Sequence, residues 1–242
     1  MRRHTPGVVP ASQLVPARIA RVERLDARRV VELLEPLVLD RRRERLLSVL
    51  NRRLSSLQVL FDAPHDPHNG AAVVRSCEAF GVQFVNVVER KEQFLLAPTV
   101  ARGSEKWIDI RRWTSAAEAV LAMKKDGLEL VAAHPEGELA PEDLAEIPRV
   151  GVVLGNERDG IADDLIASCT RRVRVPMRGF VESLNVSVSA AILLAAASAS
   201  REGDLSEEDR IRLYARGLYF SVDRADDVLR ELFSSTDNDA IA

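Results

Sequence analysis

The residues best suited to chemistry in this sequence lie in a segment, residues 175–191, whose polar groups core packing does not require. Ser183 and Asn185 form a polar pair where a turn containing Pro176 and Gly179 gives way to a helix of small residues. Hydroxyl and amide groups donate and accept hydrogen bonds, so the pair could bind a polar ligand. The alternative interpretation is that Ser183 only caps the helix.

A second polar pair, Asn69 and Arg75, lies in a segment that begins His-Asp-Pro-His-Asn at residue 65. Pro67 suits the first turn of a helix, and Asn69 is a residue type that caps one. A spacing of six residues is closer to two helical turns than to one, so we expect both side chains to face the same rim. The alternative is an ordinary capped helix that carries one arginine.

Arg75 has two candidate roles. A guanidinium has a pKa above about 12 and is a poor base at neutral pH. It is better suited to stabilise negative charge that develops on a reacting oxygen and to bind an adjacent phosphate. A role as base would require a strongly desolvated site beside another cation, and the sequence does not separate the two roles.

Glu157 is the third candidate, in a loop that begins at Gly155 and ends at Gly160. The apolar run 150–154 before it is typical of a buried strand. Gly155 would let the backbone approach a ligand closely, and Gly160 permits a tight turn into the next helix. We expect Glu157 to orient Asn185 or the neighbouring loop, and a solvated turn carboxylate is the alternative.

The elements that must position these residues alternate between strand-like and helix-like patterns. This alternation predicts an α/β fold with a mostly parallel sheet covered by helices on both faces. Ligands bind at the carboxyl ends of the strands in such sheets, where the three polar segments therefore converge. The β-rich runs are residues 57–61, 83–88, 107–112, 129–133, 150–154 and 171–175, and the amphipathic stretches between them include residues 70–80, 115–125 and 162–168.

Helical patterns precede and follow this alternating region. Residues 15–53 predict two helices broken at Pro36. Residues 184–232 also predict helices. We expect residues 1–14 to be a flexible lead-in and residues 234–242 to be a polar tail.

Positive charge is concentrated near the N-terminus. Residues 1–60 hold 13 arginines and 6 acidic residues, whereas residues 61–242 carry 21 basic and 31 acidic residues. Guanidinium groups bind phosphate bidentately and stay charged, so this segment could bind RNA, and a solvated, arginine-rich helix face is the alternative. The RNA contacts that we expect are Arg41, Arg42, Arg43, Arg45, Arg52 and Arg53.

Several classes of protein are disfavoured by composition. Cys77 and Cys169 are far apart and lack metal-ligand spacing, which indicates reduced thiols in a cytoplasmic protein. The histidines are scattered, so we expect no metal. The richest apolar stretch, residues 184–199, is interrupted by serines and too short to span a bilayer, so no membrane role is expected. No GxGxxG opens a helix and no Walker loop is present, which disfavours dinucleotide and nucleoside triphosphate sites.

Together, the three polar segments resemble the signature motifs of the SPOUT superfamily of RNA methyltransferases. The similarity is greatest to the TrmH-type tRNA (guanosine-2′-O-)-methyltransferases, and residues 103–108, Gly-Ser-Glu-Lys-Trp-Ile, match a further segment of that branch. The resemblance covers about residues 41–200 and does not include the first 40 residues.

This resemblance implies a SPOUT fold with a deep C-terminal trefoil knot, helical N- and C-terminal extensions, and S-adenosyl-L-methionine bound in the knot. It also implies a homodimer formed through the helix after Asn185, in which an arginine of one protomer can complete the site of its partner. The implied cofactor-binding residues are Ala133, His134, Leu154, Gly155, Val175, Met177 and Leu184, and the implied catalytic residues are Arg75, Asn69, Glu157, Ser183 and Asn185.

The implied function is methylation of a ribose 2′-hydroxyl in tRNA, at guanosine-18 of the D-loop. We expect residues 1–56 to be a basic helical extension that binds tRNA, residues 57–203 the methyltransferase domain, and residues 204–242 C-terminal helices and a tail. A methyltransferase of ribosomal RNA is the alternative, although residues 1–56 look too short and too helical for the separate RNA-binding domain common in that branch. A non-catalytic RNA-binding protein of the same fold is a third interpretation, which the presence of all five catalytic residue types disfavours.

Overall fold

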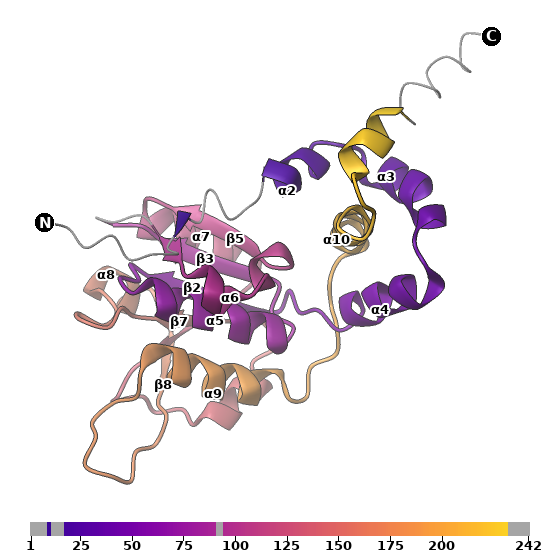
Figure 1. The fold of residues 1–242 in the computed structure, drawn as a ribbon. Helices are drawn as coiled ribbons and strands as arrows, with labels where there is room; N and C mark the ends of the chain where they lie inside the picture. The colour runs from indigo at the N-terminus through magenta and orange to yellow at the C-terminus, as the bar shows by residue number, and fades with distance from the viewer. Residues whose placement is uncertain (1–8, 11–16, 91–93, 232–242) are drawn as a thin grey trace, which may run out of the picture. The chain divides into compact units, whose positions relative to one another are not determined.

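The computed structural model describes residues 9–10, 17–90 and 94–231. The chain divides into two compact units, one containing residues 1–14 and 54–202 and the other residues 15–53 and 203–242. We call them the sheet unit and the helical unit after their main elements (Figure 1). No helix among the described residues is long and apolar enough to cross a membrane.

The sheet unit is built on six parallel strands. Their order across the sheet is β5-β3-β2-β7-β6-β8, and every neighbouring pair is parallel. The predicted α/β fold with a mostly parallel sheet is therefore confirmed. The strands are β2 (Leu57–Asp62), β3 (Phe84–Val88), β5 (Asp109–Trp113), β6 (Glu129–Ala133), β7 (Val150–Leu154) and β8 (Arg171–Val173).

Helices cover both faces of this sheet, which gives three layers (Figure 1). Side chains alternate between the two faces of a strand. In β2, Val59 and Phe61 therefore join the core beneath one helical layer, and Leu60 joins the core beneath the other. The first layer contains α5 (Pro67–Ala79), η3 (Pro141–Glu146) and α9 (Val186–Ser198), and the second contains α7 (Ala116–Lys125) and α8 (Asp163–Ile166).

The direction in which strands are added reverses between β2 and β7. The chain steps from β2 through β3 to β5 at one edge, and β7, β6 and β8 then lie on the other side of β2. Phe61 and Leu154 are paired at the end of this central strand pair. The crevice outside the carboxyl ends of strands at such a reversal is where open α/β sheets bind ligands.

Short elements complete the sheet unit. β1 (Val9–Pro10) pairs antiparallel with β4 (Leu95–Leu96), and α6 (Pro98–Ala101) and η2 (Ser104–Lys106) precede β5. Gly103, the first residue of the segment 103–108, has a φ of +88°. That conformation favours glycine, so this segment begins with a turn that a larger residue would strain.

The helical unit contains one more helix before residue 53 than the sequence predicts. Asp26 begins a separate helix, α3, because its carboxylate accepts a hydrogen bond from the amide of Arg29 at 2.7 Å. Pro36 lies in the 3-10 turn that follows α3. The elements are α2 (Ala17–Val22), α3 (Ala27–Leu34), η1 (Glu35–Leu37), α4 (Asp40–Leu50) and α10 (Glu207–Tyr219), and residues 225–231 are also helical.

Helix α10 forms the centre of the helical unit. Arg216 is 1% exposed and its guanidinium pairs with the carboxylate of Glu23. Gly217 allows a close approach to α4, because a Cβ there would lie 2.8 Å from Leu46 Cδ2. The predicted lead-in is described only at residues 9–10, and the predicted tail lies outside the described residues.

Candidate functional site

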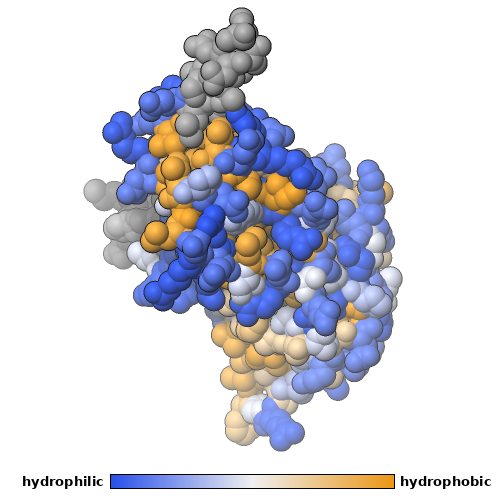
Figure 2. All heavy atoms as spheres, turned by 90° about the vertical axis from the view of Figure 1, so that its right-hand side faces the viewer, coloured by the Kyte–Doolittle hydropathy of each residue, from blue (hydrophilic) through white to orange (hydrophobic). Residues whose placement is uncertain are grey.

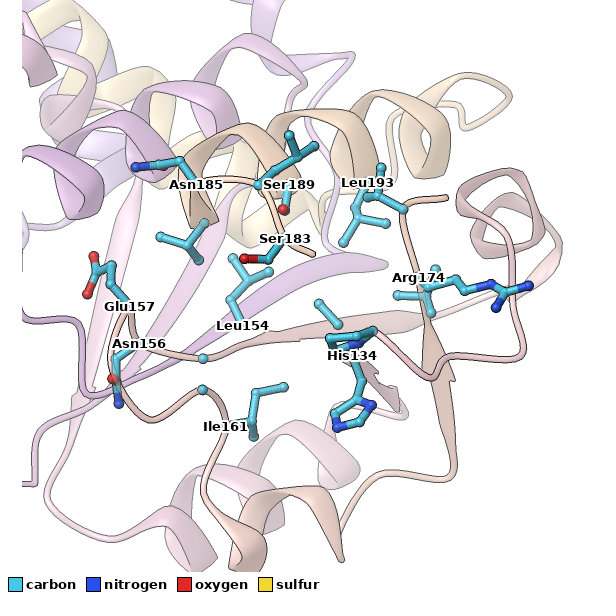
Figure 3. A pocket seen from close by; sticks show the side chains of 18 of the residues that line it. His134, Leu154, Asn156, Glu157, Ile161, Arg174, Ser183, Asn185, Ser189 and Leu193 are labelled. Atoms are coloured by element: carbon cyan, nitrogen blue, oxygen red, sulfur yellow. The ribbon is translucent and has the colours of Figure 1, made fainter. Parts of the chain in front are cut away.

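A cavity of about 740 Å³ lies at the carboxyl ends of β6, β7 and β8 (Figure 3). Its walls come from residues 133–135, residues 154–161, and the connection between β8 and α9. This volume is in the range that holds small-molecule cofactors. All seven predicted cofactor-binding residues line it: Ala133, His134, Leu154, Gly155, Val175, Met177 and Leu184.

The loop after β7 closes on itself. Asn156 and Gly160 exchange two backbone hydrogen bonds of 3.0 and 3.2 Å, and Asn156 Oδ1 accepts from two further amides of the loop. Gly160 has a φ of +70°, in agreement with the predicted tight turn. At Gly155 a Cβ would lie 2.2 Å from the carbonyl carbon of Gly160. Gly155 therefore admits the backbone of its own loop, where we expected a ligand.

Three predicted residues from distant parts of the chain form one hydrogen-bond network. Asn69 Nδ2 donates to Glu157 Oε1 at 2.7 Å, and Asn185 Nδ2 donates to Asn69 Oδ1 at 3.0 Å. Asn185 Oδ1 accepts from the backbone amide of Ser187 at 2.8 Å. A backbone amide only donates and a carboxylate only accepts, so the two ends fix the direction of every bond. Glu157 orients Asn185 through Asn69.

The residues that cap α5 and α9 differ from those predicted. These caps explain why the side chain of Asn69 can join the network and why that of Ser183 can face the cavity. Asp66 caps α5 by accepting from the amide of His68 at 2.8 Å, so the expected cap at Asn69 is wrong. Asn69 instead lies in the first turn, 9% exposed, with its side chain committed to the network. Asn185 caps α9, so Ser183 does not, and Ser183 lines the cavity (Figure 3).

Arg75 takes no part in the hydrogen-bond network of Asn69, Glu157 and Asn185. It is exposed on α5 and is not among the residues that line the cavity. Six residues along an α-helix leave two side chains about 120° from alignment, which is why Asn69 is buried and Arg75 is exposed. Among the residues that the structure describes, none forms a hydrogen bond or ion pair with the guanidinium of Arg75.

The cavity combines an apolar wall with negative charge. Leu154, Ile161 and Leu193 are buried residues that contribute to the wall (Figure 3). Four carboxylates and one arginine, Arg174, also line it, so the lining is net negative and suits a ligand with an aromatic part and a positive charge. Sequence reasoning missed Ile161 and Leu193, because their apolar side chains resemble those of any core position. The four carboxylates are Glu157, Asp159, Asp163 and Glu182.

The predicted RNA-binding arginines differ in exposure. Arg43 is half-buried and pairs with Asp40. Arg53 is 2% exposed, so a phosphate cannot reach its guanidinium and the expected RNA contact there is corrected. The sequence shows a basic run but not that the chain becomes buried after α4 ends. Four others are exposed: Arg41, Arg42, Arg45 and Arg52.

Exposed apolar residues accompany these arginines in the helical unit. Figure 2 shows a face of the molecule on which apolar side chains stand among hydrophilic ones. Leu37, Leu39 and Leu47 are 55%, 82% and 40% exposed.

Within the described part of the chain, no group of three or more histidine, cysteine, aspartate or glutamate side chains could hold a metal ion.

Comparison with known sequences gives relatives that modify RNA. The model of the SpoU rRNA Methylase family matches residues 56–195. The tRNA (guanosine(18)-2′-O)-methyltransferase of Aquifex aeolicus is 30% identical over 207 residues, which cover 82% of this chain and 95% of the relative. The 23S rRNA (guanosine-2′-O-)-methyltransferase RlmB of Coxiella burnetii is 31% identical over 161 residues, which cover 65% of this chain and 64% of the relative.

Solved structures show the same fold. The TrmH/SpoU tRNA modifying enzyme of A. aeolicus has a TM-score of 0.68 and 27% identity to this chain, covering 76% of this chain and 98% of that one. The SpoU methyltransferase AviRb of Streptomyces viridochromogenes was solved in complex with the cofactor AdoMet. It has a TM-score of 0.52 and 25% identity, covering 62% and 58% of the two chains.

Proposed function

The chain belongs to the SpoU rRNA methylase family, and we propose that it methylates the ribose 2′-hydroxyl of guanosine 18 in the D-loop of tRNA. S-adenosylmethionine is the methyl donor. The observation that carries the proposal is the cavity at the carboxyl ends of β6, β7 and β8, which is lined by the motif residues and bordered by the Glu157–Asn69–Asn185 network.

The extent of the similarity supports tRNA over ribosomal RNA as the substrate. The alignment takes in 95% of the A. aeolicus tRNA enzyme but 64% of the C. burnetii ribosomal RNA enzyme. The match to the ribosomal RNA enzyme keeps that substrate as the second candidate. In either case we propose that the exposed arginines of the helical unit bind the RNA backbone, since guanidinium groups match phosphate in charge and geometry.

S-adenosylmethionine fits the cavity in size and chemistry. The apolar wall at Leu154, Ile161 and Leu193 suits an adenine ring, and the carboxylates suit a sulfonium. Ala133, His134 and the other predicted contacts would hold it there. When bound, this cofactor supplies a methyl group whose departure leaves a neutral thioether, so no acid is needed.

The chain's own residues supply alignment and exclusion of water. We propose that the Glu157–Asn69–Asn185 network fixes the first turn of α9 against the loop after β7, so that Ser183 and Asn185 present fixed groups to the ribose. Holding the reacting atoms in line accounts for a large part of such a rate enhancement. This explains a site without a histidine or cysteine nucleophile among the proposed catalytic residues.

Arg75 acts, in this proposal, in the site of a second copy of the chain. It is exposed in one chain and absent from the cavity walls of that chain. Helix α9 packs against α5 and exposes Val188 and Ile192, 45% and 36%, which a homodimer would cover. Arg75 of one protomer would then stabilise the alkoxide that forms at its partner's site, or take the proton if that site is strongly desolvated.

Three further features belong to the proposal. The connection 174–185 would thread through a neighbouring loop as a trefoil knot, which is supported by its sharing the cavity walls with residues 154–161. The sheet unit would serve as the methyltransferase domain and the helical unit as the tRNA-binding part. The enzyme would act in the cytoplasm, where its substrate is.

Transfer of labelled methyl to unmodified tRNA transcripts tests this proposal. We expect one 2′-O-methylguanosine, at position 18, after nuclease digestion. The matched control is a transcript with 2′-deoxyguanosine at that position, which lacks the acceptor oxygen and should stay unlabelled. Labelling of ribosomal RNA but not tRNA would favour the second candidate, and equal labelling of both tRNA transcripts would exclude the proposed nucleotide.

A further inference from the structure

The loop between β7 and α8 forms one wall of the cavity and must be anchored at both ends. Its first end is anchored by the sheet, because Leu154 is paired with Phe61 of β2. Its second end, at Ala162, enters a helix of only four residues, which is too short to be rigid by itself. Ile161, just before this end, is 8% exposed and lines the cavity.

The anchor for the second end is a buried carboxylate. Asp62 is the last residue of β2, and its side chain is 1% exposed. Its Oδ2 accepts a hydrogen bond from the amide of Ala162 at 2.9 Å. Both ends of the loop are therefore fixed to β2, the first by strand pairing with Phe61 and the second by the side chain of the next residue.

The positive charge of Arg90 compensates the negative charge of the buried Asp62 carboxylate. Its Nε bonds Asp62 Oδ1 at 2.7 Å, and its Nη2 and Nη1 bond the two oxygens of Asp164 at 2.6 and 3.2 Å. One guanidinium thus joins the end of β2 to the first turn of α8. The hydrogen bonds from Arg90 lower the pKa of Asp164, so the outer carboxylate stays ionised at neutral pH.

We propose that Asp62, Arg90 and Asp164 form a positioning clamp that holds the loop 155–161 in the shape that binds the cofactor. The clamp rests on the proposed function for the identity of the ligand. These three residues contact no reacting group; they act through Ala162 and Ile161. Loss of the clamp should weaken cofactor binding and leave the turnover rate of the loaded enzyme nearly unchanged.

Three substitutions, one at each residue of the clamp, disrupt its hydrogen bonds to different extents. Asp164→Asn acts on a side chain that is 54% exposed, so the fold should survive. Arg90→Lys keeps the charge but replaces a fork by one ammonium, which cannot bridge two carboxylates in the same way. Asp62→Asn places an amide donor against either the Ala162 amide or the Arg90 guanidinium, both of which are donors.

The matched control is Glu129→Gln, which breaks a similar arginine–carboxylate pair at the amino ends of β6 and β8. Glu129 accepts from two nitrogens of Arg171 at 2.6 and 3.0 Å, away from the cavity. The binding probe is S-adenosylhomocysteine, which cannot react. We expect its Kd to rise about three- to tenfold in Asp164→Asn and Arg90→Lys, and to stay at the wild-type value in the control.

Two further readouts separate positioning from loss of fold. At saturating S-adenosylmethionine, kcat of Asp164→Asn should stay within about twofold of wild type while its KM for this cofactor rises. Hydrogen exchange at the Ala162 amide should be faster in Asp164→Asn and Arg90→Lys, and unchanged in Glu129→Gln.

The outcomes are distinct. Wild-type Kd in both Asp164→Asn and Arg90→Lys, or a fall in kcat without a change in Kd, would overturn the clamp. If the wild-type protein bound neither S-adenosylmethionine nor its product, the proposed function would fail. Exchange at Ala162 would then decide the clamp alone, since unchanged exchange in both variants rejects it and faster exchange supports it.

Discussion

The two rims of the sheet are both rich in polar side chains, but they use them differently. At the amino ends of the strands, two arginines form hydrogen bonds with groups of the protein itself. Arg201 donates to the carbonyl oxygens of Leu144 and Pro148 at 3.0 and 2.7 Å. Arg171 forms two bonds to Glu129. No residue of this set lines the cavity.

At the carboxyl ends, the polar groups surround open space. The hydrogen bonds that run from Ser187 through Asn185 and Asn69 to Glu157 border a cavity of about 740 Å³. Arginine-centred hydrogen bonds therefore stabilise the fold at the amino-end rim, whereas the network of asparagine, serine and glutamate at the other rim borders the cavity that we propose binds the cofactor. We expect substitutions at the carboxyl-end rim to change binding and turnover, and substitutions at the amino-end rim to change stability.

The largest effect is expected from Gly155→Ala. The new Cβ would lie 2.2 Å from Gly160 C and 2.4 Å from Ile161 N, which are backbone atoms that cannot rotate away. The loop must open, so we expect affinity for S-adenosylhomocysteine to fall at least about 100-fold, or about 2.8 kcal/mol. Equilibrium binding measures this. Gly179→Ala is the control, since a Cβ there meets nothing within 4 Å, and equal affinities of the two variants would contradict the assignment of the loop to the cofactor site.

A smaller loss is expected from Asn69→Asp, which keeps the shape of the side chain. The new carboxylate still accepts from Asn185, but it faces Glu157 where a 2.7 Å hydrogen bond stood. Two carboxylates so close do not both ionise easily. We expect kcat/KM to fall about 30-fold at pH 7.5, or about 2 kcal/mol, and to recover in part as pH falls and one proton bridges the pair. If the pH profile of kcat/KM were parallel to that of the wild type, the donor and acceptor order of the hydrogen bonds in the network would be unimportant for catalysis.

The sequence predicts which polar residues lie at the carboxyl ends of the strands, but it does not predict the hydrogen bonds between them. Residues 57–61 are apolar except for Gln58, and residues 150–154 contain no polar side chain, so their strand character and the polar residues that follow them can be recognised locally. The link between Asn69 and Glu157 joins residues 88 positions apart, and only the strand order brings them together. Local signals also compete: Asp66 caps α5 because its carboxylate reaches the amide of His68, which leaves Asn69 inside the helix.

Burial is the other property that the sequence pattern does not fix. Arg53 follows Arg52 in a basic run, yet Arg52 is exposed and Arg53 is 2% exposed. Asp62 ends an apolar strand and carries no motif, so its role at the loop after β7 depends on tertiary contacts with Ala162 and Arg90. Charge counts predict which segment is basic, and packing decides which of its side chains a ligand can reach.

At the amino-end rim, Arg201→Met should lower stability without changing catalysis. The guanidinium bonds the carbonyl oxygens of Leu144, Ile147 and Pro148, and methionine keeps much of the volume but none of the donors. Carbonyl groups left unsatisfied cost about 1–3 kcal/mol each, and with partial access to water we expect a total of about 2 kcal/mol. Urea unfolding measures the loss. At 20 °C or below, kcat/KM should stay within about twofold of wild type, and a larger fall would show that this rim also shapes the site.

The smallest effect is expected from Glu129→Gln, and its pH dependence sharpens the comparison. The hydrogen bond from Arg171 lowers the pKa of Glu129 in the folded protein. A carboxyl with a lowered folded pKa stabilises the fold above its unfolded pKa, and this stabilisation is lost as pH falls through the folded pKa. The two side chains are 31% and 39% exposed, so solvent screens the pair and we expect about 0.5 kcal/mol at pH 7. The difference in unfolding free energy between wild type and variant should begin to shrink below about pH 4, near the unfolded pKa of glutamate, and should vanish only below the lowered folded pKa, where both proteins carry a neutral group at this position. A difference that did not shrink at all as the pH fell below about 4 would come from shape rather than charge, and the amino-end rim would then be held by packing more than by its ion pair.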